Sequence, residues 1–467
     1  MNIIPIIALL LGVALMLFLI MKTRVNAFMA LIISSLGIAL MCGLSFADSI
    51  SAVTSGFGNT MTSIGIIIVL GCIMGEFLAE SGAAKRIALT ILKAVGVKNA
   101  DVVLGLTGYI VSIPVFSDSG FIILSQLAKE FSRLTKKSVV GFSGMLVMGL
   151  YLTHFLVPPT PGPLATAANF GVDLGSFIIW GLLLALPMLL VAIPLFRYFS
   201  RKFSDVIVPD DTDLSKLSEE EKATYLRIVA KRDRGEELTS QDFNDLLKAE
   251  ELPGAAISFA VIVVPLLLIL ANTVSGLVGL TGPIKEFLAF IGNPVFALIV
   301  SALMAMYLLM RIDRKRAQDI ASKALASAGL AAFVTAAGGA MGNVIKVTEI
   351  GTILAEGIIN SGIPAILVPM LVGCLLRSAQ GSGATAMITG SAILAPIIPT
   401  LQLNPLLAGL ALCCGAMPVS YVNDSLFWVV SNFGAMDVKT TLKSWTIASA
   451  VVPLLGCAIL FVASFFV

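Results

Sequence analysis

Long, almost uncharged segments recur along the whole chain and constrain its fold more than any other feature. Residues 3–21, 174–196 and 254–280 contain no Asp, Glu, Lys or Arg. About 20 apolar residues are enough for a helix to cross a bilayer. A soluble chain of 467 residues could not bury a composition that is 58% hydrophobic and 12% charged. Because the runs are continuous rather than alternating, we expect an all-α polytopic membrane protein and not a transmembrane barrel.

Clusters of Lys and Arg between these segments orient them, because such clusters stay on the cytoplasmic side. Lys22 and Arg24 follow the first segment, which favours a retained first span over a cleaved leader and predicts a periplasmic N-terminus. Lys439 and Lys443 precede the last span, so the C-terminus is predicted to be periplasmic as well. A loop carrying Asp48 is expected between the second and third spans. The expected spans are 3–21, 25–46, 61–80, 138–157 and 174–196, then 254–280, 289–310, 324–345, 402–419 and 444–466.

Two further apolar stretches are broken in the middle. Residues 102–128 lie between Lys98 and Lys129, and their centre reads IPVFSDSG. A single crossing would put one of these two basic clusters outside, so we predict a re-entrant hairpin that enters from the cytoplasm. Residues 363–400, with RSAQGSG in the middle, are predicted to form a second hairpin that enters from outside. Non-helical backbone at this depth is tolerated only where protein or a water-filled cavity surrounds it.

Short patterns of the first half return in the second. Ser119-Gly120 and Ser382-Gly383 are 263 positions apart, and Asn169-Phe170-Gly171 and Asn432-Phe433-Gly434 are separated by the same distance. We therefore predict two inverted repeats, each of about five transmembrane helices and one hairpin, at residues 1–202 and 254–467. Broken helices in inverted repeats are typical of secondary transporters.

Residues 203–253 form the one long polar segment and are predicted to be a cytoplasmic helical linker. Ser218 followed by three glutamates is a typical helix start, and Gly235 is a typical stop. A second short helix is expected to begin at Thr239 or Ser240. We interpret the linker as a connector without transport chemistry.

Arg377 is the residue that most needs an explanation, because a charged side chain inside a membrane is costly and usually marks a pair or a functional site. Its guanidinium matches a carboxylate at two points. One interpretation is that it docks an anionic substrate. The other is a structural ion pair with Asp118 or Asp424.

Three more titratable side chains lie in the broken stretches. Asp118 and Asp424 are candidates for the proton carrier, and each has a second interpretation as a helix cap or a partner of Arg377. His154, the one histidine of the chain, is a candidate for proton coupling or for donating to substrate oxygens. A lone histidine on an apolar helix is also common as a hydrogen-bonded packing residue.

The loop PPTPGP and the hydroxyl and amide groups of the broken stretches complete the candidate substrate site. The prolines are expected to hold an extended backbone, either as a rigid substrate loop or as an external turn. Hydroxyls and amides suit a polyhydroxylated ligand. The candidate substrate-binding residues are Arg377, Ser117, Ser119, Gly120, Thr160, Pro161, Gly162, Ser378, Ser382, Gly383, Thr385 and Asn423.

Cofactor chemistry has no signature in this sequence. There is no phosphate-binding loop, which argues against ATP-driven transport, and no Cys/His cluster that would bind a metal. The six cysteines lie in apolar segments, and we interpret them as small core residues. No basic patch suggests nucleic acid as a partner. The expected partners are a small anionic organic substrate, protons and the lipid bilayer.

Five stretches, IPVFSDSGFIIL, THFLVPPTPGPLATA, LLRSAQGSGATA, VSYVNDSLFW and LKSWT, resemble the gluconate permease (gluconate:proton symporter) family in the same order over nearly the whole chain. The resemblance implies proton-coupled uptake of gluconate or a related small carboxylate, including D-serine, across the inner (cytoplasmic) membrane. It also implies a homodimer with a moving transport domain. The residues to which it points are Asp118, Gly120, His154, Pro158, Pro159, Pro161, Gly162, Pro163, Arg377, Ser382, Ala384, Thr385, Asn423, Asp424 and Trp428.

The chain departs from the family pattern at the expected site. Gluconate members tend to have Phe-Phe-Asp-Val-Gly where residues 116–120 read Phe-Ser-Asp-Ser-Gly, His at the position of Thr160, and Leu-Gly-Ser at residues 380–382. These departures leave carboxylate transport as the expectation and the identity of the carboxylate open.

The predicted function is a secondary active transporter, and not an enzyme, that carries a small hydroxy-carboxylate such as gluconate together with a proton. The alternatives are D-serine or another small amino or keto acid as the substrate, and Na⁺ instead of H⁺, which the hairpin carbonyls, Asn169 and Asn432 would suit. A channel or a membrane enzyme is a more distant alternative, because neither a continuous polar stripe nor a nucleophile with a base is evident.

Overall fold

The structure is a computed structural model, and it describes residues 4–23, 25–210, 218–309, 314–348, 350, 353, 362–422 and 424–466. In these residues helices are joined by turns, and no strand occurs. The first half contains α1 Ile4–Lys22, α2 Ala27–Met41, α3 Phe46–Thr60, α4 Ile66–Glu80, α5 Ala83–Val95, α6 Ala100–Val111, α7 Ser117–Thr135, α8 Val139–Leu156, α9 Pro161–Asn169 and α10 Leu174–Lys202. The linker contains α11 Glu219–Asp233 and α12 Ser240–Leu246. The second half contains α13 Ala255–Leu277, α14 Pro283–Ile291, α15 Pro294–Met304, α16 Arg314–Val347, α18 Leu367–Gln380, α19 Gly383–Leu394, α20 Pro405–Gly415, α21 Ser425–Phe433, α22 Val438–Thr441 and α23 Ile447–Ala463.

Six helical runs in the described residues are long and apolar enough to cross a membrane. They are Phe46–Glu80, Val139–Asn169, Leu174–Lys202, Ala255–Leu277, Lys315–Val347 and Val438–Ala463. A seventh is added if the pair α14 and α15, bent by 53° at its break, counts as one span. The other expected spans, at 3–21, 25–46 and 402–419, coincide with the shorter apolar helices α1, α2 and α20.

Two stretches that the sequence suggested as connections are helical. Residues 46–60 form α3, which continues through a π-helical turn into α4, so the expected loop with Asp48 is wrong. The Ser45 hydroxyl caps α3 by accepting from the Asp48 amide at 3.1 Å, and Gly56 lets α3 lie against α16. The extended backbone predicted for residues 158–163 is also wrong in its second half, because α9 begins at Pro161. Proline suits the first position of a helix, where the amide hydrogen would have no partner within the helix.

Both broken apolar stretches are pairs of helices joined by a tight turn. The turn at 112–116 joins α6 to α7, and residues 381 and 382 join α18 to α19. Gly108 of α6 and Gly149 of α8 let these helices touch, since a Cβ on Gly149 would lie 2.1 Å from a carbonyl oxygen of α6. Gly373 of α18 and Gly415 of α20 make the corresponding contact, where a Cβ on Gly415 would lie 2.2 Å from a carbonyl oxygen of α18. Each helix pair therefore packs on the helix that follows it through a glycine crossing.

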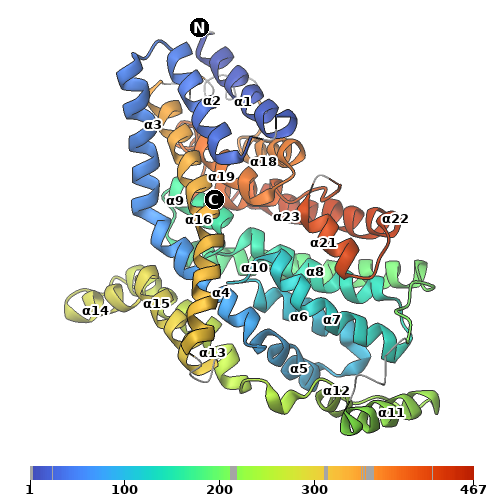
Figure 1. Cartoon of the computed structure of the whole chain (residues 1–467). Helices are drawn as coiled ribbons and strands as arrows, with labels where there is room; N and C mark the ends of the chain where they lie inside the picture. Colours follow the sequence, from blue (N-terminus) through green and yellow to red (C-terminus); the bar gives the residue numbers. More distant parts are fainter. Residues whose placement is uncertain are drawn as a thin grey trace.

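The two halves have the same order of elements. Each half has a long helical run, then a helix pair, then a broken helix and then a final long helix. In the first half these are α3–α4, α6–α7, α8–α9 and α10, and in the second half they are α16, α18–α19, α20–α21 and α22–α23. The counterpart of α5 would fall at 350–361, almost entirely outside the described residues. Figure 1 shows α3–α4 and α16 side by side along the molecule. The halves also interlock, because α9 packs on α19 while α21 packs on α7.

The linker is attached to the first half at its hydrophilic end. Its helix starts are confirmed: Ser218 and Thr239 each form a capping box, and Gly235 follows α11 with a φ of 73°. The Arg86 side chain of α5 donates to the carbonyl of Pro253 at 2.6 Å. Phe243 of α12 is buried against the ring of Phe131, with 4.6 Å between centroids.

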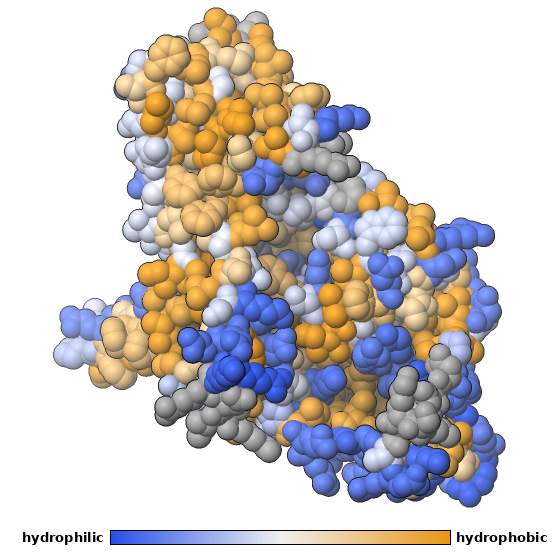
Figure 2. Space-filling view, in the orientation of Figure 1, coloured by the Kyte–Doolittle hydropathy of each residue, from blue (hydrophilic) through white to orange (hydrophobic). Residues whose placement is uncertain are grey.

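The outer surface has the pattern of a protein that contacts lipid. Figure 2 shows apolar side chains over the upper helices and hydrophilic side chains gathered at the lower end, where α11 and α12 lie. Large exposed apolar residues such as Leu10, Phe46, Trp180 and Leu267 lie on the outward faces of helices. Apolar exposure on this scale is unusual for a soluble protein and fits a bilayer. The cysteines are buried or half-buried and free.

Candidate functional site

A cavity of about 640 Å³ lies where the broken stretches of both halves meet. It is lined by the starts of α7, α9, α19 and α21, by the C-terminal end of α8, by Arg377 of α18, and by parts of α2 and α16. Its volume is in the range of small-molecule sites, and apolar and aromatic side chains lie beside polar ones in its lining, as such sites commonly have.

Four helices begin at this cavity. Residues 116–119, 161, 382–385 and 424–426 line it, and these are the first turns of α7, α9, α19 and α21. Backbone N–H groups at helix starts have no partner within the helix, and the helix dipole places about half a positive charge there. Converging helix starts therefore make a site that favours an anion without any side chain.

The local sequence explains why the chain breaks here. Gly381 ends α18 with a φ of 74°, a conformation that suits glycine, and Ser382 then caps α19 by accepting from the Thr385 amide at 3.3 Å. In the first half, Pro114 precedes an extended Phe116, after which α7 begins. The sequence QGSG is therefore a helix stop followed at once by a helix start.

Arg377 forms a buried ion pair with Asp424, the alternative interpretation offered above. Its side chain is 2% exposed and donates to an Asp424 oxygen and, at 2.5 Å, to the carbonyl of Gly381. The guanidinium also lies 5.9 Å from the centre of the Phe155 ring. Its Nε has no hydrogen-bond partner among the described residues. In this conformation the arginine joins the α18–α19 turn to the start of α21.

Asp424 is held from several sides. It accepts hydrogen bonds from Arg377, from the Ser420 hydroxyl and, at 3.2 Å, from the Leu426 amide, so it also caps α21. Ser420 in turn accepts from the Trp445 indole at 2.8 Å. This network gives Asp424 the two structural roles that the sequence left open, a cap and a partner of Arg377.

Asp118 has a different environment. It lies in the first turn of α7, and its carboxylate accepts from the Ser425 hydroxyl at 2.9 Å and the Ser117 hydroxyl at 3.5 Å. No ion pair involves it within the described residues. Because Ser425 begins α21, this hydrogen bond also joins the two halves of the chain. Asp118 is thus the carboxyl group of the cavity that has no cation as a direct partner in the described structure.

His154 points its ring into the same cavity and is 7% exposed. It lies between Phe116 and Phe155, with ring centroids 5.6 and 5.7 Å away. Its Nδ1 has no hydrogen-bond partner among the described residues. Buried polar atoms are normally paired, so this nitrogen, itself buried, needs a partner that the described residues do not supply, such as a water molecule.

The remaining candidate residues divide into two groups. Ser117, Ser119, Pro161, Ser382, Gly383 and Thr385 line the cavity. Gly120, Thr160, Gly162 and Ser378 do not. The Thr160 hydroxyl donates to the His154 and Val157 carbonyls, at 2.8 and 2.9 Å, so it holds the loop rather than a ligand. Gly162 lets α9 approach Met387, and the Ser378 carbonyl accepts from Tyr421. Asn423 lies outside the described residues.

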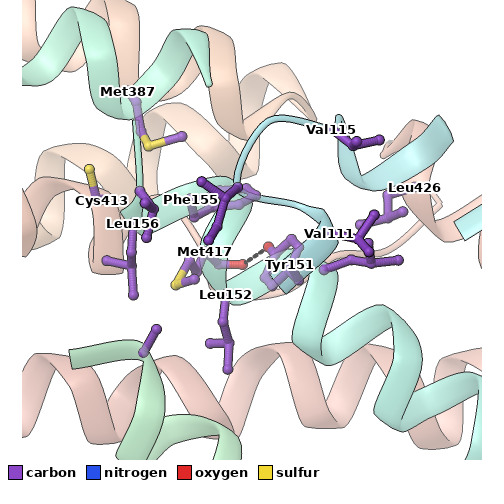
Figure 3. Packing of buried hydrophobic residues seen from close by; sticks show 14 of the residues in the cluster. Val111, Val115, Tyr151, Leu152, Phe155, Leu156, Met387, Cys413, Met417 and Leu426 are labelled. Atoms are coloured by element: carbon purple, nitrogen blue, oxygen red, sulfur yellow. Dashed lines mark hydrogen bonds between the residues drawn. The ribbon is translucent and has the colours of Figure 1, made fainter. Parts of the chain in front are cut away.

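Tyr151 and Phe155 line the cavity from α8, although neither was among the residues expected from the sequence. Figure 3 shows both side chains on this helix, with Tyr151 donating to the Met417 carbonyl. They lie three residues before and one after His154. The spacing of Tyr151 and His154 on one helix face was the signal that could have identified the tyrosine.

Comparisons with known proteins identify the family and the fold of the chain. Residues 4–466 match the sequence model of a protein family that is described as GntP family permease. A permease of Haemophilus influenzae described as uncharacterized is 38% identical over 96% of this chain and 90% of its own length. A gluconate permease of Bacillus subtilis is 28% identical over 98% of this chain and 99% of its own length. The YdaH transporter of Alcanivorax borkumensis has a similar fold, with a TM-score of 0.63 at 14% identity, over 94% of this chain and 98% of that one.

Proposed function

The chain belongs to the GntP family of permeases, and from this premise we propose that it is a secondary transporter that takes up a small hydroxy-carboxylate, such as gluconate, together with a proton. Its family and relatives are permeases, so it is a multi-pass transporter of the inner membrane and not an enzyme. The observation that carries the proposal is the cavity at which four helices begin.

The substrate carboxylate binds at these helix starts. The Ser382 and Thr385 hydroxyls and the backbone amides of α7 and α19 are the donors nearest to it. Hydroxyl groups of the substrate lie against His154, which lines the cavity and whose imidazole can accept or donate a hydrogen bond. Arg377 acts mainly by holding the α18–α19 turn against α21, since Asp424 already occupies its guanidinium.

Proton coupling follows from the position of Asp118. A second carboxylate bound in the same cavity, at roughly 6 Å from an ionised Asp118, would be repelled by about 3 kcal/mol at an effective dielectric constant of about 20. A proton on Asp118 removes this repulsion. The proton and the anion therefore bind more tightly together than alone, which is the coupling that symport requires.

We also propose that the two halves are inverted repeats at residues 1–202 and 254–467, and that each helix pair is a re-entrant hairpin. The matching order of elements, the glycine crossings of α6 with α8 and of α18 with α20, and the exchanged contacts of α9 and α21 support a two-fold relation. Both termini are then periplasmic and the linker is cytoplasmic. A homodimer with a moving transport domain belongs to the same proposal.

The substrate can differ from gluconate without any change in this mechanism. The H. influenzae relative, at 38% identity, has no named substrate, while the B. subtilis relative is named for gluconate at 28%. Ser117 and Ser119, where the family tends to have Phe and Val, make this cavity more polar on the α7 side. D-serine or another amino or keto acid, and Na⁺ in place of the proton, are the variants to be compared.

Purified protein in liposomes tests the proposal. An inward proton gradient should drive accumulation of labelled gluconate or another short hydroxy-acid, and competition by keto acids and D-serine should rank the substrates. Replacement of external Na⁺ by choline should leave uptake unchanged. Uptake that requires Na⁺, or that ignores a proton gradient, would remove proton coupling from the proposal.

A further inference from the structure

A second cavity, far more basic than the first, lies between the start of α6, the start of α8 and the end of α10. Its volume is about 540 Å³. Five of its lining residues are cationic and one is acidic, Asp101. The cationic residues are Lys98, Lys136, Lys137, Arg197 and Arg201.

Part of this positive charge has no acidic partner among the described residues. Arg197 donates to Asp101 at 2.6 Å, and Lys98 pairs with Glu237 of the linker at 2.7 Å. Lys136, Lys137 and Arg201 form no ion pair with any residue that the structure describes. Lys136 lies near enough to Asp210 to help lower the pKa of that carboxyl group. Lys137 and Arg201 are therefore the two cations of this cavity for which the described residues supply no acidic partner, and an anion bound here would balance them.

The lipid-facing side of α10 leads directly into this cavity. Leu183, Leu190, Pro194, Arg197 and Arg201 are exposed and follow one another at intervals of seven, four, three and four residues, which places them on one face of the helix. The same face is therefore apolar along its length and basic at its end. This is the pattern expected where acyl chains lie along a helix and a negative headgroup meets cations at the membrane surface.

The polar groups around the cavity suit a phosphate. The guanidinium of Arg201 is without a partner in the described structure and can bind two phosphate oxygens. Ser138, which caps α8, and Ser200 and Ser204 place hydroxyl groups in the lining. The start of α8 adds the positive end of a helix dipole.

We propose that this cavity binds the phosphate headgroup of an anionic phospholipid, whose acyl chains lie against the exposed face of α10. The bound phosphate bridges three helices, α6, α8 and α10. Since α8 also carries Tyr151 and His154 of the central cavity, the lipid supports the helix on which the transport site is built. The inference does not depend on which substrate is carried.

The test compares thermal unfolding of the purified full chain in detergent micelles with added phosphatidylglycerol or phosphatidylcholine. Phosphatidylglycerol should raise the unfolding temperature in a saturable way, and phosphatidylcholine should not. In Lys137→Gln/Arg201→Gln the concentration for half of the effect should rise about 30-fold, because each basic residue near the surface contributes about fivefold in affinity for an anionic lipid. The control Lys439→Gln/Lys443→Gln removes two exposed lysines elsewhere and should respond like the wild type.

Four outcomes would overturn the proposal. Equal effects of the two lipids on the wild type, or a phosphatidylglycerol response that Lys137→Gln/Arg201→Gln retains in full, would show that the cavity does not bind this headgroup. Inorganic phosphate or glycerol phosphate acting at the same concentration as phosphatidylglycerol would assign the site to a soluble phosphate. Loss of a dimer in Lys137→Gln/Arg201→Gln, measured by light scattering, would show that a second copy covers this face. Equal unfolding temperatures of both variants and the wild type in phosphatidylcholine verify that the variants fold.

Discussion

The buried pair of Arg377 and Asp424 can be tested by removing its charges one at a time and then together. The account predicts that Arg377→Met and Asp424→Leu each destabilise the protein and that the double variant recovers much of the loss. The reason is that each single change leaves the other charge buried without its partner, whereas the double change leaves two apolar side chains of similar size.

The hydrogen bonds of the pair determine how much free energy of unfolding each variant should lose. Removing one partner of a buried ion pair costs about 3–5 kcal/mol. In Arg377→Met the carboxylate keeps the Ser420 hydroxyl and the Leu426 amide as donors, so the loss should be near the low end, about 3 kcal/mol. Asp424→Leu also removes the cap of α21, which adds about 1 kcal/mol. The double variant retains only the cap and packing losses, about 1–2 kcal/mol.

The assay is unfolding in mixed micelles of dodecyl maltoside and SDS, followed by tryptophan fluorescence, with substrate binding measured on the same samples. A double variant whose loss equals the sum of the two single losses would refute the coupling. The binding measurement separates two roles of Arg377. A folded double variant that binds substrate within about tenfold of the wild type supports positioning, whereas complete loss of binding from a folded variant would restore direct docking by Arg377.

Three further predictions concern other parts of the molecule. Gly149→Ala should lower the unfolding temperature strongly, because its Cβ would lie 2.1 Å from a carbonyl of α6, whereas Gly37→Ala, with no atom within 4 Å, should be neutral. His154→Phe should keep the fold and raise the KM for a hydroxy-acid with little effect on the unfolding temperature; an unchanged KM would remove His154 from the substrate site. In the linker, partial burial raises the pKa of Asp242, but hydrogen bonds from Lys231 and the Thr239 cap lower it overall, below its ordinary 3.8. Its contribution is therefore present above pH 3.8 and lost as the pH falls through the lowered value. Asp242→Asn should speed amide hydrogen exchange in α11 and α12 at pH 7, and the difference from the wild type should fade in acid.

Much of the architecture could be predicted from local sequence. Gly381 and Ser382 stop one helix and start the next, and Ser218, Gly235 and Thr239 delimit the linker helices by capping alone. These features depend on the few residues around each helix end, so the sequence is sufficient for them.

The features that could not be predicted from the sequence are those that depend on tertiary contacts. Residues 46–60 are polar and rich in glycine, and they are helical because α16 packs against them. The sequence could not decide whether Arg377 meets a substrate or Asp424. Arg377 and Asp424 are 47 residues apart, and only the tertiary fold brings their side chains together. Thr160 was expected at the ligand, but the unpaired carbonyls at the end of α8 take its hydroxyl instead.

Asp118→Asn in proteoliposomes tests the central claim most directly, because the amide keeps the shape of the carboxyl group and cannot carry a proton. This variant should still exchange labelled for unlabelled substrate across the membrane, since the helix starts still bind the anion, but it should no longer accumulate substrate under an inward proton gradient. Full accumulation driven by the proton gradient in Asp118→Asn would show that Asp118 does not carry the coupled proton.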